Sequence, residues 1–354
     1  MGRVISATVE TLENGELLAR WVVTGAPTPV RVATGLTPDV RQHHHTQTVA
    51  AGLTSLRIAA RPEERRFVSI AAEGDGSVLV TADRRVAFEG VQNFRDLGGY
   101  TTLSGGHLRW GILYRADALH ALSERDEILF RSLKVRKVYD LRSQHEIELN
   151  PNRVPSEHSP IASRPRVAAS NRLSDVGETL EAGEKMLADL YRRIIDDAAT
   201  NLGRLYTDLA QPGNLPAVIQ CQVGKDRTGL AIAILLEAIG VTRETILDDY
   251  ELSTVFGGKR QPPPVFDKLL ELGLTREAAA GVLTAPRWAM RQALDYITIS
   301  YGTVDSYLTG RAGMSLEDLE TLRAALVDGC RADPASRPNG TTTIIHPTSS
   351  IRPL

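Results

Sequence analysis

The stretch that most constrains the fold is AVIQCQVGKDRTGLAIAILLEAIGV, which runs from Ala217 to Val241. It begins as a short strand-like run, passes through Cys221 into a polar turn that contains Gly224, and continues as an apolar run of helical length. A buried strand that ends in a glycine-containing turn and leads into a helix is typical of α/β proteins, which bind ligands at the carboxyl ends of their strands. The stretch therefore predicts an α/β fold with a ligand site beside Cys221.

The region from 89 to 330 carries the same alternation on a larger scale. Strand-like runs such as LKVRKVYDL and PAVIQC are separated by runs such as ERDEILFRSLK and GETLEAGEKMLADLYRRIIDDAATNLGRLYTDLA. The latter two have apolar residues at steps of three and four, which is the period of an amphipathic helix. We expect one domain over 89–330, with a central sheet flanked by helices.

The first 88 residues have a different pattern. A turn at Asn14-Gly15 precedes a strand-like run from Leu17 to Val23, and further short runs follow, divided by Gly, Pro and charged residues. This spacing predicts a small antiparallel all-β sandwich over 1–88. The triplet 43–45 consists of three histidines, but adjacent strand residues point to opposite faces, so we interpret it as a solvated loop. The last segment, 331–354, is rich in Pro, Ser and Thr and is expected to be a flexible tail.

Charge and cysteine content limit the classes of partner and compartment. The chain has 41 basic and 43 acidic residues, so its net charge of −2 provides no electrostatic reason to expect a nucleic-acid partner or a membrane surface. We also expect no membrane insertion, because no apolar run is long enough to span a bilayer. The first residues lack the apolar core of a signal peptide, and Cys221 and Cys330 are far apart. Together these features predict a cytoplasmic protein; they leave the oligomeric state open.

The turn after Cys221 has the properties of an anion site. A glycine-containing turn at the start of a helix directs several backbone N–H groups inward, and the helix dipole adds positive potential. Arg227 can grip a phosphate with two parallel hydrogen bonds, and the same field favours the thiolate form of Cys221. The alternative is a buried, inert cysteine before an ordinary helix. The joint pattern of strand, Cys, five residues, Arg, Thr, Gly and apolar helix indicates phosphoryl transfer through a cysteinyl-phosphate.

The segment CQVGKDRTG resembles the signature of the cysteine-dependent protein tyrosine phosphatase superfamily. Its Lys-Asp pair before the arginine resembles the bacterial tyrosine and phosphoinositide phosphatase branch. Further stretches resemble that branch between about 88 and 328: NFRDLGGY, RWGILYRADAL, VYDLRSQHE, LDDYELST and YGTVDSYL. The resemblance implies a tyrosine-phosphatase-like sheet and a phosphomonoester hydrolase that uses no metal or other cofactor. The substrate it implies is a small-molecule phosphate, a phosphoinositide or phosphotyrosine.

The resemblance also assigns roles to the residues of the loop. Cys221 is the nucleophile, Thr228 hydrogen-bonds the thiolate, and Asp226 is the general acid and base. The phosphate is bound by the Arg227 side chain and by the loop amides, those of Gln222, Val223, Gly224, Lys225, Asp226 and Arg227. The side chain of Lys225 is expected to face the substrate and to favour additional negative charge.

Several residues outside the loop are ambiguous. Asp140 is either a second candidate for the general acid or a structural carboxylate bonded to Arg142, with equal weight on the two. Arg95 and Asp96 are expected to form a scaffold pair that holds the loop. Asp249 and Tyr250 are expected near the pocket, with core packing as the preferred role of Tyr250.

One position departs from the family pattern. The residue before the nucleophile is usually histidine, which helps to keep the thiolate ionised, and here it is Gln220. Glutamine can hydrogen-bond but carries no charge. Two functions therefore remain open: an active phosphatase, or a catalytically impaired phosphatase-like module that binds phosphorylated ligands. The segment between Ser253 and Arg287 is expected either to cover the pocket and select the substrate or to form an ordinary surface helical hairpin.

Overall fold

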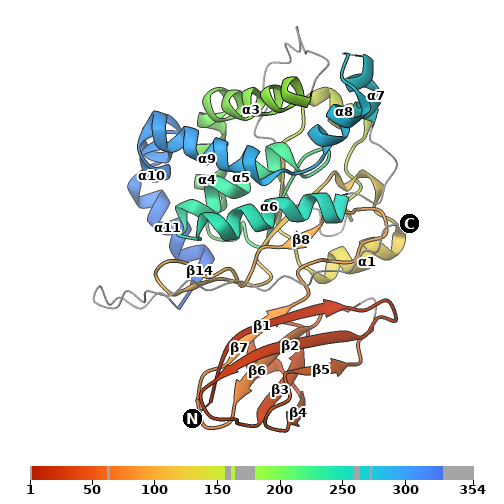
Figure 1. The fold of residues 1–354 in the computed structure, drawn as a ribbon, viewed down its shortest axis with the longest axis vertical. Helices are drawn as coiled ribbons and strands as arrows, with labels where there is room; N and C mark the ends of the chain where they lie inside the picture. The colour runs from red at the N-terminus through yellow and green to blue at the C-terminus, as the bar shows by residue number, and fades with distance from the viewer. Residues whose placement is uncertain are drawn as a thin grey trace.

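The computed structural model describes residues 2–61, 64–155, 161–163, 180–257, 264–271 and 273–329. A β-sandwich comes first in the chain and an α/β domain follows, and the two lie against each other (Figure 1). The predicted tail over 331–354 and Cys330 lie outside the described residues. Within the described ranges, no helix is both long and apolar enough to cross a bilayer.

The N-terminal sandwich consists of two antiparallel sheets, as predicted. One has the strand order β1-β2-β5 and the other β4-β3-β6-β7, and side chains such as Trp21, Val32 and Ile70 fill the space between them. The sequence patterns did not reveal β1 or β4, whose residues are mostly polar or partly exposed. The strands are β1 (Arg3–Thr11), β2 (Leu17–Thr24), β3 (Val30–Gly35), β4 (His45–Val49), β5 (Ser55–Ile58), β6 (Phe67–Ala72) and β7 (Leu79–Ala82).

The histidine triplet is not a continuous loop. His43 is tethered, with Nδ1 2.9 Å from the Ser69 hydroxyl and Nε2 2.8 Å from the Thr37 carbonyl, and His45 is already the first residue of β4. The strand begins there because His45 pairs with Thr34 of β3. In the part of the chain that the structure describes, no group of three or more His, Cys, Asp or Glu side chains is arranged to hold a metal.

The α/β domain is organised around a five-stranded sheet of order β12-β11-β13-β10-β8. Neighbouring strands run parallel except for β8, which is antiparallel to β10. Because β13 is central, Cys221 emerges between the carboxyl ends of β10 and β11. The strands are β8 (Arg95–Asp96), β10 (Leu113–Ala116), β11 (Lys137–Asp140), β12 (Ile161–Ser163) and β13 (Ala217–Gln220), and β9 (His107–Leu108) pairs separately with β14 (Val327–Asp328).

Helices cover both faces of this sheet (Figure 1). Alternate residues of β13 point to opposite faces, so Ile219 packs with the large helical cluster around α5 and Val218 packs with α1. The long helical run predicted before β13 is interrupted at Ala198, where φ is −98° and ψ is 5°. The helices are α1 (Glu124–Ser132), α2 (Gln144–Leu149), α3 (Leu180–Asp197), α4 (Ala199–Leu209), α5 (Asp226–Ala238), α6 (Arg243–Gly257), α7 (Pro264–Glu271), α8 (Arg276–Leu283), α9 (Arg287–Tyr301), α10 (Val304–Ser306) and α11 (Leu316–Leu326).

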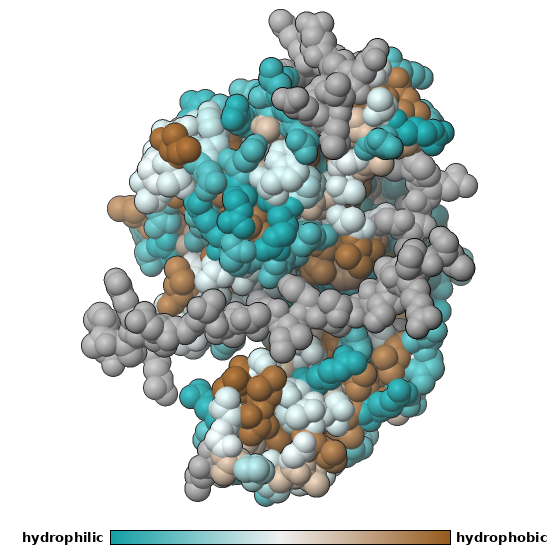
Figure 2. All heavy atoms as spheres, in the orientation of Figure 1, coloured by the Kyte–Doolittle hydropathy of each residue, from teal (hydrophilic) through white to brown (hydrophobic). Residues whose placement is uncertain are grey.

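The surface over α6 and α9 is strongly hydrophilic (Figure 2). Arg287 lies 2.8 Å from Glu244 and also pairs with Asp248, and Arg291 lies 2.9 Å from Glu244. These charges are already matched within the chain and are partly exposed. We therefore interpret this face as a solvated surface that ties the two helices together.

Candidate active site

The loop after β13 turns sharply at Gly224, where φ is +71°. A Cβ atom at this position would lie 2.5 Å from the Ala116 carbonyl oxygen at the end of β10. The left-handed backbone and this close approach both require glycine. The loop is therefore fixed against the neighbouring strand end, directly after Cys221.

Three consecutive carbonyls of the loop are held from outside. The Ala118 N–H donates to the Gln222 carbonyl at 3.3 Å and the Asn93 amide to the Val223 carbonyl at 3.1 Å. The Arg115 guanidinium donates to the Gly224 carbonyl at 2.7 Å. In a planar trans peptide the N–H points opposite to the C=O. The amides of residues 223–225 are therefore turned toward the inside of the loop, where α5 begins, which is the arrangement of an anion cradle.

Cys221 and Thr228 lie at the two ends of this cradle. Cys221 is a free thiol that is 2% exposed. Thr228, in the first turn of α5, is fully buried, and its hydroxyl has no hydrogen-bond partner among the residues that the structure describes. An unpaired buried hydroxyl is costly. The Thr228 hydroxyl is therefore available to donate a hydrogen bond to a bound substrate or to the thiolate of Cys221.

Arg227 is oriented by Glu146. Its Nη1 and Nη2 atoms each lie 2.7 Å from a carboxylate oxygen of Glu146, and Nη1 also donates to the Leu141 carbonyl at 3.3 Å. A guanidinium has five N–H donors, so the Nε donor and one Nη2 donor remain. These two lie on one edge and form a fork for two oxygens of a phosphate. Burial raises the pKa of Glu146, but the hydrogen bond and charge of Arg227 lower it to about 2.

The importance of Glu146 was missed in the sequence. It is the third residue of α2, and it completes a capping box in which its carboxylate accepts the Ser143 N–H at 2.7 Å. The Ser-x-x-Glu pattern is a signal for a helix start, and it predicts only that role. Its contact with a residue 81 positions later depends on where α2 packs.

Lys225 differs from the expectation that its side chain faces the substrate. Its ammonium group donates to the carbonyl of Val282 and, at 3.0 Å, to that of Thr284, at the end of α8. It also lies 3.3 Å from Asp226. All three ammonium donors are thus engaged, and the side chain is 6% exposed. The end of α8, within the segment expected to cover the pocket, therefore lies against the loop, whereas residues 258–263 of that segment lie outside the described residues.

The geometry favours Asp226 over Asp140 as the general acid. Asp226 is 29% exposed and accepts a hydrogen bond from the Tyr191 hydroxyl at 2.8 Å. Asp140 is 3% exposed and is held by the guanidinium of Arg142 at 2.8 and 2.9 Å and by the Asn152 amide at 3.1 Å. Such a carboxylate, saturated by a permanent cation, is poorly placed to exchange protons with a ligand. These contacts, with the Arg142 N–H that Asp140 also accepts at 3.1 Å, tie it to the turn after β11.

Arg95 and Asp96 do not form the expected pair. They are adjacent strand residues and point to opposite faces. Arg95 donates to Asp249 at 3.0 Å, and Asp96 lies 2.6 Å from Arg65 of the sandwich. Asp249 is 1% exposed, so it belongs to the buried scaffold.

Asp249 lies between two cations. Arg115 donates to its second carboxylate oxygen at 2.6 Å. Burial opposes ionisation, yet the guanidinium groups of Arg95 and Arg115 hold the pKa of Asp249 well below its usual range. Two guanidinium groups and one carboxylate leave a net positive charge beneath the loop. Tyr250, the next residue, is 1% exposed in the core, with its hydroxyl against that of Tyr191.

Gln220 lies at the end of β13, directly before the nucleophile position. It is fully buried, and neither its Oε1 nor its Nε2 atom has a partner within the described ranges. Its side chain therefore makes no hydrogen bond to the loop or to the thiol. Its main-chain carbonyl does contribute, since it accepts the Leu141 N–H at 2.9 Å and links β13 to the turn that carries Arg142.

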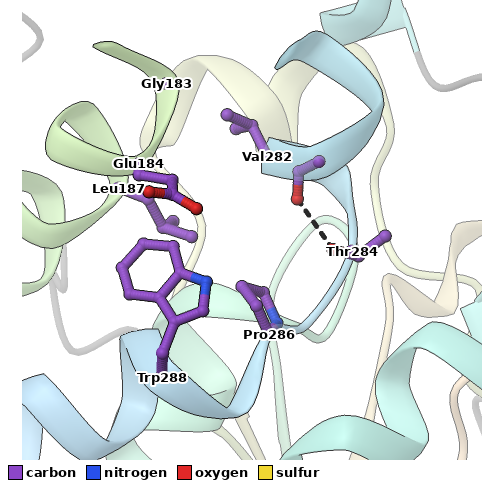
Figure 3. Close-up of a pocket in the computed structure, with 8 residues that line it drawn as sticks. Gly183, Glu184, Leu187, Val282, Thr284, Pro286 and Trp288 are labelled. Carbon is purple, nitrogen blue, oxygen red and sulfur yellow. Dashed lines mark hydrogen bonds between the residues drawn. The ribbon is translucent and has the colours of Figure 1, made fainter. Parts of the chain in front are cut away.

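A small cavity of about 110 Å³ lies between α3, the end of α8 and the start of α9 (Figure 3). Its walls include Leu187, Val282, Pro286 and the indole of Trp288, and Glu184 is its charged group. Two of its elements also contact the loop. The end of α8 accepts hydrogen bonds from Lys225, and one turn beyond Leu187, α3 supplies the tyrosine hydroxyl that binds Asp226.

The chain is similar to known phosphatases over most of its length. The model of the tyrosine phosphatase family matches residues 86–328, more than half of the chain, so the chain belongs to that family. It is 28% identical over 275 residues to the triple specificity protein phosphatase PtpB of Mycobacterium tuberculosis, covering 67% of this chain and 97% of that protein. A protein named as a tyrosine-protein phosphatase in Cupriavidus necator is 24% identical over 243 residues, covering 68% and 88%.

Among solved structures, the catalytic core of the PP-IP phosphatase Siw14 from S. cerevisiae matches 59% of this chain and 94% of its own. The sequence identity is 14% and the TM-score is 0.25, a likeness too weak to support a conclusion. Family membership therefore depends on the match over 86–328. It identifies the protein as a cysteine-dependent phosphatase.

Proposed function

We propose that the loop 221–228 hydrolyses phosphomonoesters in two steps. In the first, the Cys221 thiolate attacks phosphorus, the bond to the leaving oxygen breaks, and Asp226 gives its proton to that oxygen. In the second, water attacks the cysteinyl-phosphate, Asp226 takes a proton from that water, and the sulfur–phosphorus bond breaks. The hydroxyl of Thr228 stabilises the departing thiolate.

The observation that supports this most strongly is the outward fixing of three consecutive loop carbonyls. It turns the amides of residues 223–225 toward the inside of the loop, and two donors of Arg227 remain for a phosphate bound there. Donors that are fixed before the reaction stabilise the charge on the equatorial phosphate oxygens without reorganisation. A phosphoryl group matches this set because it presents three such oxygens.

The substrate that we propose is a phosphomonoester with a compact, uncharged leaving group, such as a phosphotyrosine side chain or a small aryl phosphate. The walls of the cavity between α3 and the end of α8 are mostly apolar, with Glu184 as the charged group, and the cavity has room for about one ring. The only ammonium group in the loop, that of Lys225, is occupied by carbonyls. A second phosphate on the leaving group would therefore meet the Glu184 carboxylate, and the loop 221–228 offers it no free ammonium group.

This substrate class can be tested with Lys225→Met. The ratio of kcat/KM for p-nitrophenyl phosphate to that for a water-soluble phosphoinositide should be the same in the variant and in the wild type. A selective loss of phosphoinositide turnover in the variant would show that Lys225 releases the carbonyls and contacts a second phosphate.

The reaction itself is tested by Cys221→Ser, with Cys330→Ser as the matched control. Phosphate release from p-nitrophenyl phosphate should disappear in the first variant and be unchanged in the second. The alternative of a phosphate-binding module without catalysis would be supported if the wild type binds inorganic phosphate but hydrolyses none of a panel of phosphomonoesters.

We further propose that the protein acts in the cytoplasm. The proposed nucleophile must remain a reduced thiol, and a reducing compartment provides that condition. Expression of a tagged chain followed by fractionation would test this, and recovery outside the cytoplasm would contradict it.

A further inference from the structure

One of the contacts between the β-sandwich and the α/β domain is a buried arginine, beside the hydrogen bond from the Trp110 indole to the Val80 carbonyl at 3.0 Å. Arg65 precedes β6, yet its guanidinium lies 2.6 Å from Asp96 of β8 and donates to the Tyr114 hydroxyl of β10 at 3.1 Å. Only 9% of its side chain is exposed. It also lies over the rings of Phe67 and Tyr114, with its central carbon 4.8 and 5.5 Å from the ring centres. Arg65 is thus the cation that matches a buried carboxylate in the other domain.

Asp96 is a junction in β8. It is fully buried, and its carboxylate also accepts the N–H groups of Gly98 at 2.7 Å and Gly111 at 2.8 Å. Its main-chain carbonyl accepts a hydrogen bond at 2.7 Å from Arg84, in the segment that connects the domains. Both the sandwich and the connecting segment therefore hold the same residue of β8.

The opposite face of β8 and β10 contacts the loop 221–228, called the phosphate loop below. In the ladder between β8 and β10, Asp96 is paired with Tyr114, and Arg95 is paired with Arg115. Since successive strand residues alternate in direction, the first pair faces Arg65 and the second faces Asp249.

A second path reaches the same carboxylate. Arg84 lies over the ring of Tyr100, 3.9 Å from its centre, and the Tyr100 hydroxyl donates to Asp249 at 2.9 Å. Asp249 in turn holds Arg115, whose guanidinium fixes the Gly224 carbonyl. Two routes therefore connect the sandwich side of the sheet to one peptide of the phosphate loop.

We propose that Arg65 is a positioning residue of the active site. By binding Asp96 and Tyr114, Arg65 fixes the positions of β8 and β10. The fixed β10 in turn keeps the Arg115 guanidinium within hydrogen-bond distance of the Gly224 carbonyl. That contact turns the N–H of the same peptide toward the phosphate. The β-sandwich is then a working part of the catalytic apparatus. This inference rests on the proposed phosphatase function.

The test uses full-length variants. Arg65→Met removes the charge but leaves the buried Asp96 carboxylate without its counter-charge. Arg65→Met combined with Asp96→Asn is therefore made as well, to remove both charges. Arg65→Lys keeps the positive charge but lacks the planar pair of N–H donors of a guanidinium. Arg66→Met is the matched control, because Arg66 is adjacent and its ion pair is with Glu64, 2.6 Å away.

Each variant is measured for kcat and KM with p-nitrophenyl phosphate, well below its unfolding temperature. Calorimetric binding of inorganic phosphate is measured separately. The double variant should lose about 10- to 100-fold in kcat and bind phosphate more weakly, because small misplacements at a reacting centre have effects of this size. Arg65→Lys should recover part of the loss, and Arg66→Met should match the wild type.

A folded double variant with wild-type kcat and phosphate affinity would overturn the proposal. If neither Arg65→Met nor its combination with Asp96→Asn folds, the test depends on Arg65→Lys. A reduced kcat with an unchanged unfolding temperature would support the positioning role of Arg65, and a wild-type kcat would refute it. Phosphate binding separates this inference from the proposed function. Absence of turnover in the wild type would refute the function, whereas the change in phosphate affinity would still test the role of Arg65.

Discussion

Replacement of Glu146 by glutamine tests how the phosphate-binding arginine is oriented. In the folded protein the carboxylate accepts two hydrogen bonds from Arg227, both of 2.7 Å, and the Ser143 N–H. Glutamine has nearly the same size and can keep the bond to Ser143 through its carbonyl oxygen. Its NH₂ group, however, would meet an N–H of Arg227, so one charge-assisted bond is lost and a donor faces a donor.

The size of the effect follows from the pKa of Glu146. Burial raises this pKa, but the contacts with Arg227 and, to a smaller extent, with Ser143 outweigh it and lower the pKa from 4.5 to about 2. This net shift corresponds to about 3 kcal/mol at ~1.4 kcal/mol per pKa unit. The side chain is 27% exposed, and solvent screening reduces the effect, so we expect a loss of about 2 kcal/mol in the free energy of unfolding at pH 7. Because Arg227 also becomes free to adopt other orientations, kcat/KM should fall by about 10-fold.

The dependence on pH has a definite sign. A carboxyl group whose pKa is lower in the folded state stabilises the protein fully above its unfolded pKa, and this stabilisation is lost as the pH falls through the folded value. For Glu146 the window extends from about pH 4.5 down to about pH 2. The difference in stability between wild type and variant should therefore be largest at neutral pH and should shrink within that window.

The assay is urea unfolding of both proteins at pH 7 and at pH 3, with phosphatase kinetics at pH 7. Glu127→Gln is a suitable control, since Glu127 forms a partly exposed pair with Arg131 at 3.3 Å, and such pairs contribute less than about 0.5 kcal/mol. The reasoning is refuted if Glu146→Gln is no less stable than this control at pH 7, or if its deficit is the same at pH 3.

Three further predictions concern the nucleophile, the acid and the pocket. Asp226→Asn should lower kcat by about 100-fold or more for an alkyl phosphate and less for p-nitrophenyl phosphate, whose leaving group needs no proton. Asp140→Asn should instead lower the stability of the protein. A leaving-group dependence of kcat in Asp140→Asn would make Asp140, and not Asp226, the general acid. Gln220→His should raise the rate at which iodoacetamide alkylates Cys221 at slightly acidic pH, and identical pH profiles would show that this position has no electrostatic effect on the thiol. Trp288→Ala should raise KM for an aryl phosphate and leave the binding of inorganic phosphate unchanged; an equal loss of both would place the indole outside the leaving-group site.

The sequence by itself determined the local architecture of the site. Strand, glycine turn and helix start are encoded by neighbouring residues, so Cys221, Gly224 and Arg227 could be placed at a strand end without knowledge of the rest of the fold. The spacing of short strands and turns in the first 88 residues, and the apolar steps of three and four residues in the helices, also predicted the fold class. These features depend on backbone conformation within a few residues, and sequence periodicity reports that conformation directly.

Only the tertiary structure decided which groups meet. Arg227 finds its carboxylate 81 positions away in Glu146, and Lys225 ends on the carbonyl of Thr284, 59 positions away. Arg65 reaches Asp96 across the domain boundary. No local pattern distinguishes a charged residue that will be buried beside a partner from one that remains in solvent. That outcome is set when the sheet edge, the helices and the sandwich pack, because burial makes an unpaired charge costly and so selects the partner.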